Sequence, residues 1–162
     1  MATSGSVETE YIEARGTCFR VEWTRTAVDT VNNKSTLTWK LYFETMYSWY
    51  LNAIRIDYVK INGTTVKGEE TYSDYSHGTF ELASGTIDIP HNSDGTKTIN
   101  IQISGWFYDW GTRTGEANFT LTTIPRPSEI TATDGNIGSK SNIKIDRKYS
   151  NVTTTVSYKI NG

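Results

Sequence analysis

The sequence has little of what metal centres and disulfide frameworks need: one cysteine, Cys18, and two histidines, His77 and His91, in 162 residues. A single thiol excludes an internal disulfide and a cysteine-based zinc site. The histidines lie far apart, each beside turn residues, and no third ligand follows at a suitable spacing. We therefore expect surface or turn histidines, and neither a metal nor another cofactor.

Long hydrophobic stretches are also missing. No segment is apolar for long enough to cross a membrane, and the first residues lack the basic and apolar regions of a secretory signal. The formal net charge is -2 and the lysines and arginines are not clustered, which argues against electrostatic binding of nucleic acid. We expect neither a membrane nor a nucleic acid as a partner.

Catalytic motifs are absent as well. The sequence contains no glycine-rich phosphate loop, no His-Glu-x-x-His and no Gly-x-Ser-x-Gly. Several acidic residues fall on predicted strands, but no spacing pairs two of them as a glycosidase would require. We therefore predict no catalytic residue and no enzymatic activity, with a glycosidase as a remote alternative.

The composition that is present favours β-structure. The chain has 26 threonines, 20 aromatic residues and only 5 leucines. Threonine and aromatic side chains suit a pleated surface, whereas leucine-poor sequences are weak helix formers. Apolar residues also recur at every second position, most clearly in residues 19–23, 37–43 and 99–103. Residues 51–58 partly fit a helical stripe, but they are rich in β-branched residues and precede a turn, so we interpret them as a strand.

Turn sequences separate these segments. Asn62-Gly63 tolerates positive φ at both central positions of a tight hairpin, and Asn92-Ser93-Asp94-Gly95 and Asp134-Gly135-Asn136 mark further reversals. Short alternating strands joined by such turns predict an all-β protein, an antiparallel β-sandwich of jelly-roll or Greek-key type.

A change of organisation is expected near residue 124. Pro125-Arg126-Pro127 cannot supply consecutive sheet donors and reads as a linker over residues 125–128. Residues 129–162 contain no Trp or Phe and are too few to bury a core of their own. We therefore expect a sandwich domain over residues 1–124 and an incomplete second β-domain over residues 129–162, as part of a longer chain.

Aromatic residues are the positive signal for function. Seven of them fall in predicted loops or near one strand end and are candidate ligand-binding residues: Trp49, Tyr50, Tyr72, Tyr75, Trp106, Tyr108 and Trp110. Their flat apolar faces and polar tips match the C–H faces and hydroxyls of a carbohydrate. Loops on a rigid sandwich are a common place for recognition, although packing within the loops is an equally good reading of the loop residues.

The register of residues 98–110 decides whether the last three of these rings are exposed. One uninterrupted strand with its isoleucines inward would turn the rings toward solvent as a ligand platform. A β-bulge at Gly105 would instead place them in the core and leave Phe107 outside. Both arrangements remain open, and we favour the bulge because exposed rings are costly unless a ligand uses them.

Five short motifs follow one another along the chain. They are Met1-Ala-Thr-Ser-Gly-Ser; Ser48-Trp49-Tyr50 with Ile61-Asn62-Gly63; Ala83-Ser84-Gly85-Thr86 leading to Ile89-Pro90-His91-Asn92-Ser93-Asp94-Gly95-Thr96-Lys97; Thr122-Thr123-Ile124-Pro125-Arg126-Pro127; and Asp134-Gly135-Asn136-Ile137-Gly138. In this order the sequence resembles a family of uncharacterised tail proteins from siphophages and prophages of Gram-positive bacteria. Residues 105–115 are the part without a counterpart in that pattern.

The resemblance implies a minor structural or baseplate protein of the phage virion, made in the bacterial cytoplasm. It implies contact with other tail proteins, including further copies of this chain in a homo-oligomer, and with a carbohydrate of the host cell surface or cell wall. It brings no catalytic residues. A purely structural assembly module without a ligand is the alternative function, and a cell-wall glycosidase is the remote one.

Overall fold

The computed structural model describes residues 1–12, 16–46, 53–73, 76–108, 110–126, 129–132 and 143–146. Regular structure in these ranges consists of strands: β1 (Ser4–Glu8), β2 (Cys18–Asp29), β3 (Lys34–Thr45), β4 (Ile54–Ile61), β5 (Thr64–Lys67), β6 (Glu70–Tyr72), β7 (Gly78–Pro90), β8 (Thr98–Phe107), β9 (Gly111–Thr120), β10 (Glu129–Ala132) and β11 (Ile143–Asp146). None of the described residues forms a helix that could cross a membrane.

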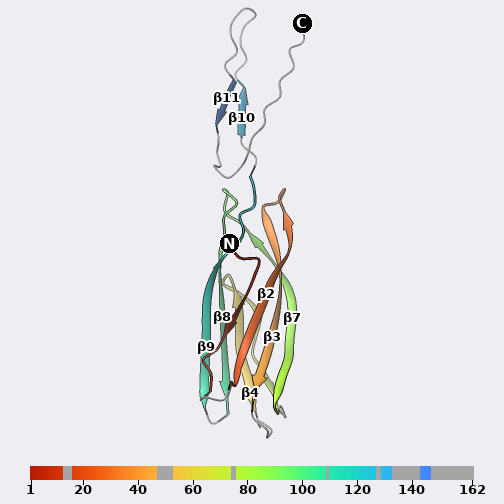
Figure 1. Cartoon of the computed structure of the whole chain (residues 1–162), viewed down its shortest axis with the longest axis vertical. Coiled ribbons are helices and arrows are strands. Elements are labelled where there is room, and N and C mark those ends of the chain that lie inside the picture. The colour runs from red at the N-terminus through yellow and green to blue at the C-terminus, as the bar shows by residue number, and fades with distance from the viewer. Residues whose placement is uncertain are drawn as a thin grey trace, which may run out of the picture.

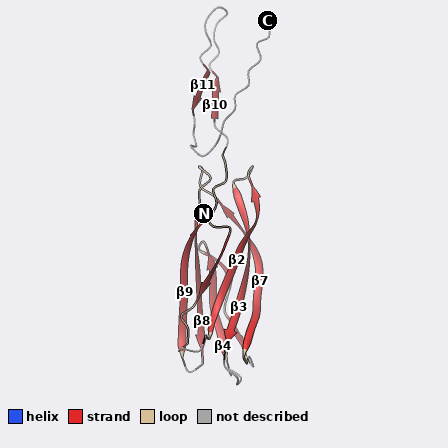
Figure 2. Ribbon diagram, viewed as in Figure 1, coloured by secondary structure: helices blue, strands red, loops and turns tan. Residues whose placement is uncertain are grey.

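Strands β1 to β9 form two antiparallel sheets that lie face to face as an elongated sandwich (Figure 1, Figure 2). One sheet has the order β1-β2-β3-β7. The other has the order β5-β4-β8-β9, and β6 also pairs with β4. Because β3 and β4 follow each other in the chain but lie in different sheets, the connections cross between the layers. The predicted antiparallel β-sandwich is confirmed.

The alternating residues fill the space between the sheets. Those predicted to face inward are buried: Phe19, Val21, Trp23, Leu37, Trp39, Leu41, Phe43, Ile99, Ile101 and Ile103. At one end of this core the ring of Phe19 packs against those of Phe43 and Phe107, with centroid separations of 5.6 Å and 4.8 Å. The ambiguous segment near residue 55 is the strand β4, with Ile54 and Ile56 in the core.

The bulge predicted at Gly105 is wrong. Strand β8 pairs with β9 without a shift of register from Thr98 to Phe107, and Phe107 is fully buried. Gly105 faces the core and lies against the ring of Phe19. A Cβ atom at this position would be only 2.3 Å from Cε2 of that ring. The irregularity belongs to the partner strand β4, where Asp57 is the extra residue.

One side of the sandwich is closed by main-chain hydrogen bonds that join the two sheets. The N–H of Ala2 donates to the carbonyl of Thr120 at 2.8 Å, and the N–H of Glu10 donates to that of Thr114 at 3.1 Å. β1 and the residues around it therefore pair with β2 in one sheet and reach the edge strand β9 of the other.

After β9 the chain is fixed at the end of the sandwich formed by connections 30–33, 62–63 and 91–97. The N–H of Ile124 donates to the carbonyl of Gly95 at 2.9 Å, and Nη1 of Arg126 donates to the carbonyl of Thr30 at 2.7 Å. Gly95 has φ +81°, and a Cβ atom there would lie 1.9 Å from the Ile124 carbonyl oxygen. Ile124 is buried, so residues up to this point belong to the sandwich.

Beyond Arg126, β10 and β11 form a separate two-stranded antiparallel sheet with Ile130 opposite Ile145. The predicted turn at residues 134–136 and the end of the chain lie outside the described residues. A second domain from residue 129 therefore stays a prediction.

Candidate functional site

The predicted binding residues that the structure describes, Tyr72, Trp106, Tyr108 and Trp110, lie at one end of the sandwich, the lower end in Figure 1, which we call the aromatic end. Strands β3 and β8 finish there, and β2, β4, β7 and β9 begin there. Its connections are residues 9–17, 46–53, 73–77 and 108–110. The chain continues from the opposite end, after Ile124, so the aromatic end is free of that attachment.

Trp106 and Tyr108 form an aromatic pair on the outer surface of this end. Since Gly105 and Phe107 face the core, Trp106 points outward from β8 and is half-buried. Its ring meets the ring of Tyr108 edge to face, with centroids 6.0 Å apart and an interplanar angle of 87°. Tyr108 is 49% exposed, so this pair offers aromatic surface to solvent.

Arg55 lies on the neighbouring strand β4, directly opposite Trp106, and its guanidinium carbon is 5.8 Å from the centre of the indole ring. Nε of Arg55 donates to Oδ1 of Asp57 at 2.8 Å. The second carboxylate oxygen of Asp57 accepts a hydrogen bond from the hydroxyl of Ser104 at 3.0 Å. The bulge residue therefore fixes the position of the arginine and balances its charge beside the indole.

Two more predicted residues, Trp110 and Tyr72, pack against the core from this end. The N–H of Trp110 donates to the carbonyl of Phe107 at 3.1 Å, which closes the turn between β8 and β9. Tyr72 ends β6 opposite Ile54, and burial together with a hydrogen bond to Glu70 raises its pKa. Both side chains are half-buried, so they support the aromatic pair more than they extend it.

The remaining candidates, Trp49, Tyr50 and Tyr75, lie outside the described residues. The connection that holds the first two re-enters the sandwich at Ala53, whose carbonyl accepts a hydrogen bond from the N–H of Tyr108 at 3.2 Å. That connection therefore returns beside the aromatic pair.

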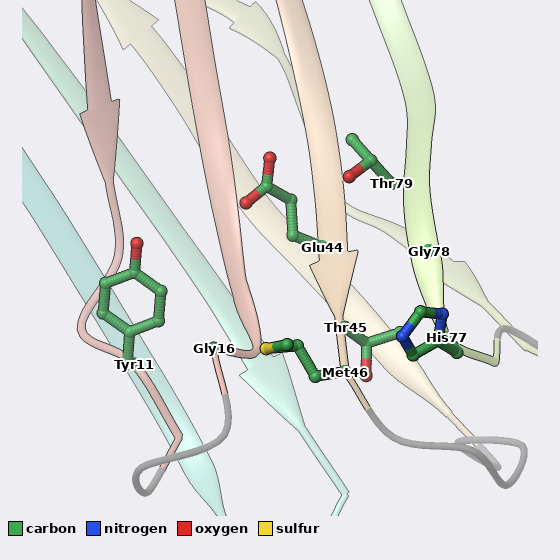
Figure 3. A pocket seen from close by; sticks show the side chains of 8 residues that line it. All are labelled: Tyr11, Gly16, Glu44, Thr45, Met46, His77, Gly78 and Thr79. Atoms are coloured by element: carbon green, nitrogen blue, oxygen red, sulfur yellow. The ribbon is translucent and has the colours of Figure 1, made fainter.

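A shallow pocket of about 310 Å³ lies at the same end, on the side of the other sheet (Figure 3). It is lined by Tyr11, Gly16, Glu44, Thr45, Met46, His77, Gly78 and Thr79. Tyr11 donates to Glu8, which raises the pKa of its phenol well above the ordinary value. Nε of Arg20 donates to Glu44 at 2.8 Å, so this carboxylate already has a cationic partner.

The pocket does not assemble a catalytic pair from the described residues. Of the described residues, Glu44 is the one carboxylate that lines it, whereas a glycosidase needs two facing carboxyl groups. Cys18 is buried nearby, and burial, with the charges of Glu44 and Glu8, raises its pKa to about 12. A thiol that holds its proton so firmly is a poor nucleophile.

The two histidines lie at opposite ends of the sandwich. His77 is exposed and lines the pocket, whereas His91 is buried beside the turn at residues 92–96. The expectation of a surface or turn position therefore holds for His77, and for His91 only the proximity to a turn does. Among the described residues no group of three or more His, Cys, Asp or Glu side chains could hold a metal ion.

Sequence reasoning missed Arg55 and Asp57. Their spacing on a predicted strand looks like an ordinary solvated face, and only the pairing of β4 with β8 brings them to Trp106 and Ser104. The bulge that turns Asp57 toward Arg55 leaves no mark in the sequence of β4 itself.

Comparison with known proteins gives a family but no described activity. No curated protein matches the sequence at a significant level. A solved structure, that of a protein designated ApaA from Bordetella pertussis, is 12% identical, with a TM-score of 0.43 over 70% of this chain and 98% of that one. Similarity this low supports no inference here. The family model described as "Siphovirus protein of unknown function (DUF859)" matches residues 9–162, nearly the whole sequence, and the chain therefore belongs to this siphovirus protein family.

Proposed function

We propose that this chain is a structural protein of a siphovirus tail, at the tip or baseplate, and that the aromatic end of its sandwich binds carbohydrate on the surface of a Gram-positive host. Membership of a siphovirus family supports a phage structural protein located in the virion. The observation that carries the binding proposal is the outward-facing pair of half-buried Trp106 and exposed Tyr108 beside Arg55.

The chemistry of the aromatic pair suits a sugar. An indole face stacks on the C–H face of a pyranose ring, and the phenol of Tyr108 and the guanidinium of Arg55 can bond to hydroxyls around it. The carboxylate of Asp57 balances the charge of Arg55. A single shallow site of this kind binds weakly, and several copies on one tail would raise the overall affinity.

The site binds and does not cleave in this proposal. Two described carboxylates near Trp106 already have partners: Asp57 is bonded to Arg55 and Ser104, and Glu69 lies 4.0 Å from the same arginine. The family description names no enzymatic activity. Exposed aromatic residues also occur at protein interfaces, so a purely structural module that packs on other tail proteins is the competing function.

The test is a binding titration of the protein with cell-wall polysaccharide from a panel of Gram-positive species. Trp106→Ala should weaken binding by about tenfold or more, which corresponds to roughly 1.4 kcal/mol. The matched control is Tyr42→Ala, because Tyr42 also lies on an outer sheet face with a guanidinium, that of Arg20, 5.0 Å from its ring centre.

A result in which no wall polysaccharide binds, while Trp106→Ala changes the oligomeric state or the incorporation into tails, would favour the structural module. Release of reducing ends from the polysaccharide, abolished by replacement of one acidic residue, would instead establish a glycosidase.

A further inference from the structure

The outer face of β8 and β9 carries a cluster of polar side chains tied to one carboxylate. Nδ2 of Asn100 donates to Oε1 of Glu116 at 2.7 Å, and Nε2 of Gln102 donates to the same oxygen at 3.3 Å. Asn100 also donates to Oδ1 of Asn118 at 2.9 Å. We call Asn100, Gln102, Glu116 and Asn118 the amide cluster.

These bonds hold the side chains in place and leave several of their oxygen atoms without a hydrogen-bond donor among the described residues. Within the described part of the chain, no hydrogen bond is recorded to the side-chain oxygens of Asn100 and Gln102 or to Oε2 of Glu116. Glu116 and Asn118 are exposed, and Asn100 and Gln102 are half-buried. The amide groups are thus oriented before any ligand arrives, which lowers the entropy cost of binding.

The amide cluster and Trp106 lie on the same face of the same strand. Residues 100, 102, 104 and 106 of β8 all point outward because side chains alternate along a strand. The strand rises about 3.3 Å per residue, so Asn100 and Trp106 are about 20 Å apart. The hydroxyls of Thr112 and Thr114 lie alongside, opposite Trp106 and Ser104. The face therefore presents a polar track that leads to the aromatic pair.

The outer face of the other sheet differs because its charges pair with one another across strands. Lys40 bonds to Glu81, Lys34 to Asp88 and Arg20 to Glu44 on neighbouring strands, and Arg20 also bonds to Glu22 on its own strand. Hydroxyl groups there, such as those of Thr24 and Thr38, are not continuous with an exposed aromatic pair. This contrast makes the face of β8 and β9 the one suited to a ligand that also contacts Trp106.

We infer that the outer face of β8 and β9 binds an extended, uncharged glycan chain that runs from Trp106 to the amide cluster. This inference rests on the proposed function and specifies its ligand. Free acceptor oxygens call for hydroxyl or N-acetyl N–H donors. The charges beside the track balance, Glu116 and Asp57 against Arg55 and Lys60, so the face does not attract a polyanion. An interface with a second copy of the chain is the competing occupant.

The experiment compares wall-polysaccharide fragments of increasing length, separated by size, on the wild type and on the double variant Asn100→Ala/Gln102→Ala. For the wild type, affinity should rise about tenfold or more from single repeating units to long fragments. The double variant should lose this gain while it binds single units as the wild type does, and Trp106→Ala should weaken binding at every length.

The control is Thr24→Ala/Thr38→Ala on the outer face of the opposite sheet, which should keep the full gain with length. Thermal unfolding of each variant checks that the sandwich is intact.

Equal affinity for single units and long fragments would overturn the extended track and leave carbohydrate binding at the aromatic end standing. Stronger binding of acidic than of neutral fragments would overturn the assignment of an uncharged ligand. A change of oligomeric state in the double variant, with glycan binding unchanged, would show an interface between copies. Absence of binding to every polysaccharide would instead remove the proposed function itself.

Discussion

The last residue of β8 and the residue that follows it have opposite environments. Phe107 is fully buried among aromatic rings, whereas Tyr108, the next residue, is 49% exposed. The two residues are similar in size and aromatic character, so the sequence alone does not separate their roles. The difference follows from the uninterrupted register of the strand.

Replacement of these two residues by alanine should have very different effects on stability. Phe107→Ala opens a cavity beside Phe19 and should lower the free energy of unfolding by about 3–5 kcal/mol. Tyr108→Ala should change it by about 0.5 kcal/mol or less. Denaturant unfolding of both variants measures the difference, and similar losses would mean that the register is shifted.

His91 is a second residue whose environment sets its chemistry. Since the carbonyl of Gly95 can only accept, Nδ1–H of His91 donates to it at 2.8 Å, and Nε2 accepts from the hydroxyl of Ser35 at 2.8 Å. The neutral ring is therefore the form that fits. Burial, helped by the charges of Arg25 and Lys97, lowers the pKa of His91 below its ordinary value of 6.5, although the bond to Gly95 opposes this shift.

Stability should consequently fall in mild acid. A histidine with a lowered pKa in the folded state binds fewer protons than in the unfolded chain, so its contribution is complete above pH 6.5 and is lost as the pH drops below that value. Thermal unfolding should show a falling midpoint between about pH 7 and pH 5, before most carboxylates titrate.

The same scan of His91→Gln should lack this decline, whereas His77→Gln, at an exposed site, should keep it. A decline that persists unchanged in His91→Gln would assign the effect to another group.

Single strands show how far sequence reasoning reaches. Alternation placed the inward residues of β2, β3 and β8 correctly because one face of each is in the core. It failed at Gly105, since a glycine in a strand marks either a bulge or a close approach, and only the ring of Phe19 from another sheet decides between them. The sequence did not predict a role for Arg55 and Asp57 for a related reason: their partners Trp106 and Ser104 are far away in the sequence.

Two turn glycines, Gly63 and Gly95, have the same backbone conformation but different surroundings. Gly63 and Gly95 both have positive φ, at +82° and +81°. A Cβ atom on Gly63 would meet nothing within 4 Å, whereas on Gly95 it would collide with the main chain at Ile124.

Gly63→Ala should therefore cost about 1 kcal/mol from backbone strain alone. Gly95→Ala should cost more, by a further 1–3 kcal/mol or so, because the segment after β9 must move away. Chemical denaturation measures both. Equal costs would show that the contact between Gly95 and Ile124 contributes nothing.

At the scale of the whole molecule, the sandwich has two structurally different ends. One end holds Ile124 and Arg126 through main-chain carbonyls, and the other collects Trp106, Tyr108 and the pocket around Glu44. The sequence predicted the aromatic candidates but not that Tyr72, Trp106, Tyr108 and Trp110 share an end, because that depends on how β4 pairs with β6 and β8. A net charge of -2 leaves no strong overall field.

Carbohydrate binding should therefore depend little on ionic strength. Stacking and hydrogen bonds to an uncharged glycan are not screened by salt, whereas recognition of a polyanion would weaken steeply. Titrations at low and at high sodium chloride concentration should give dissociation constants within about threefold of each other. A large loss of affinity in high salt would point to a charged ligand.

The closure of β1 onto β9 has a consequence for how the protein could diversify. The hydrogen bonds that join the two sheets on this side run from Ala2 and Glu10 to the main chain of Thr120 and Thr114, far in the sequence from connections 46–53 and 73–77. We therefore expect segments of other sequence grafted into those two connections to leave these bonds and the contact between Gly95 and Ile124 intact. Under the proposed function, such grafts would change which host glycan is bound while the fold of the sandwich is kept.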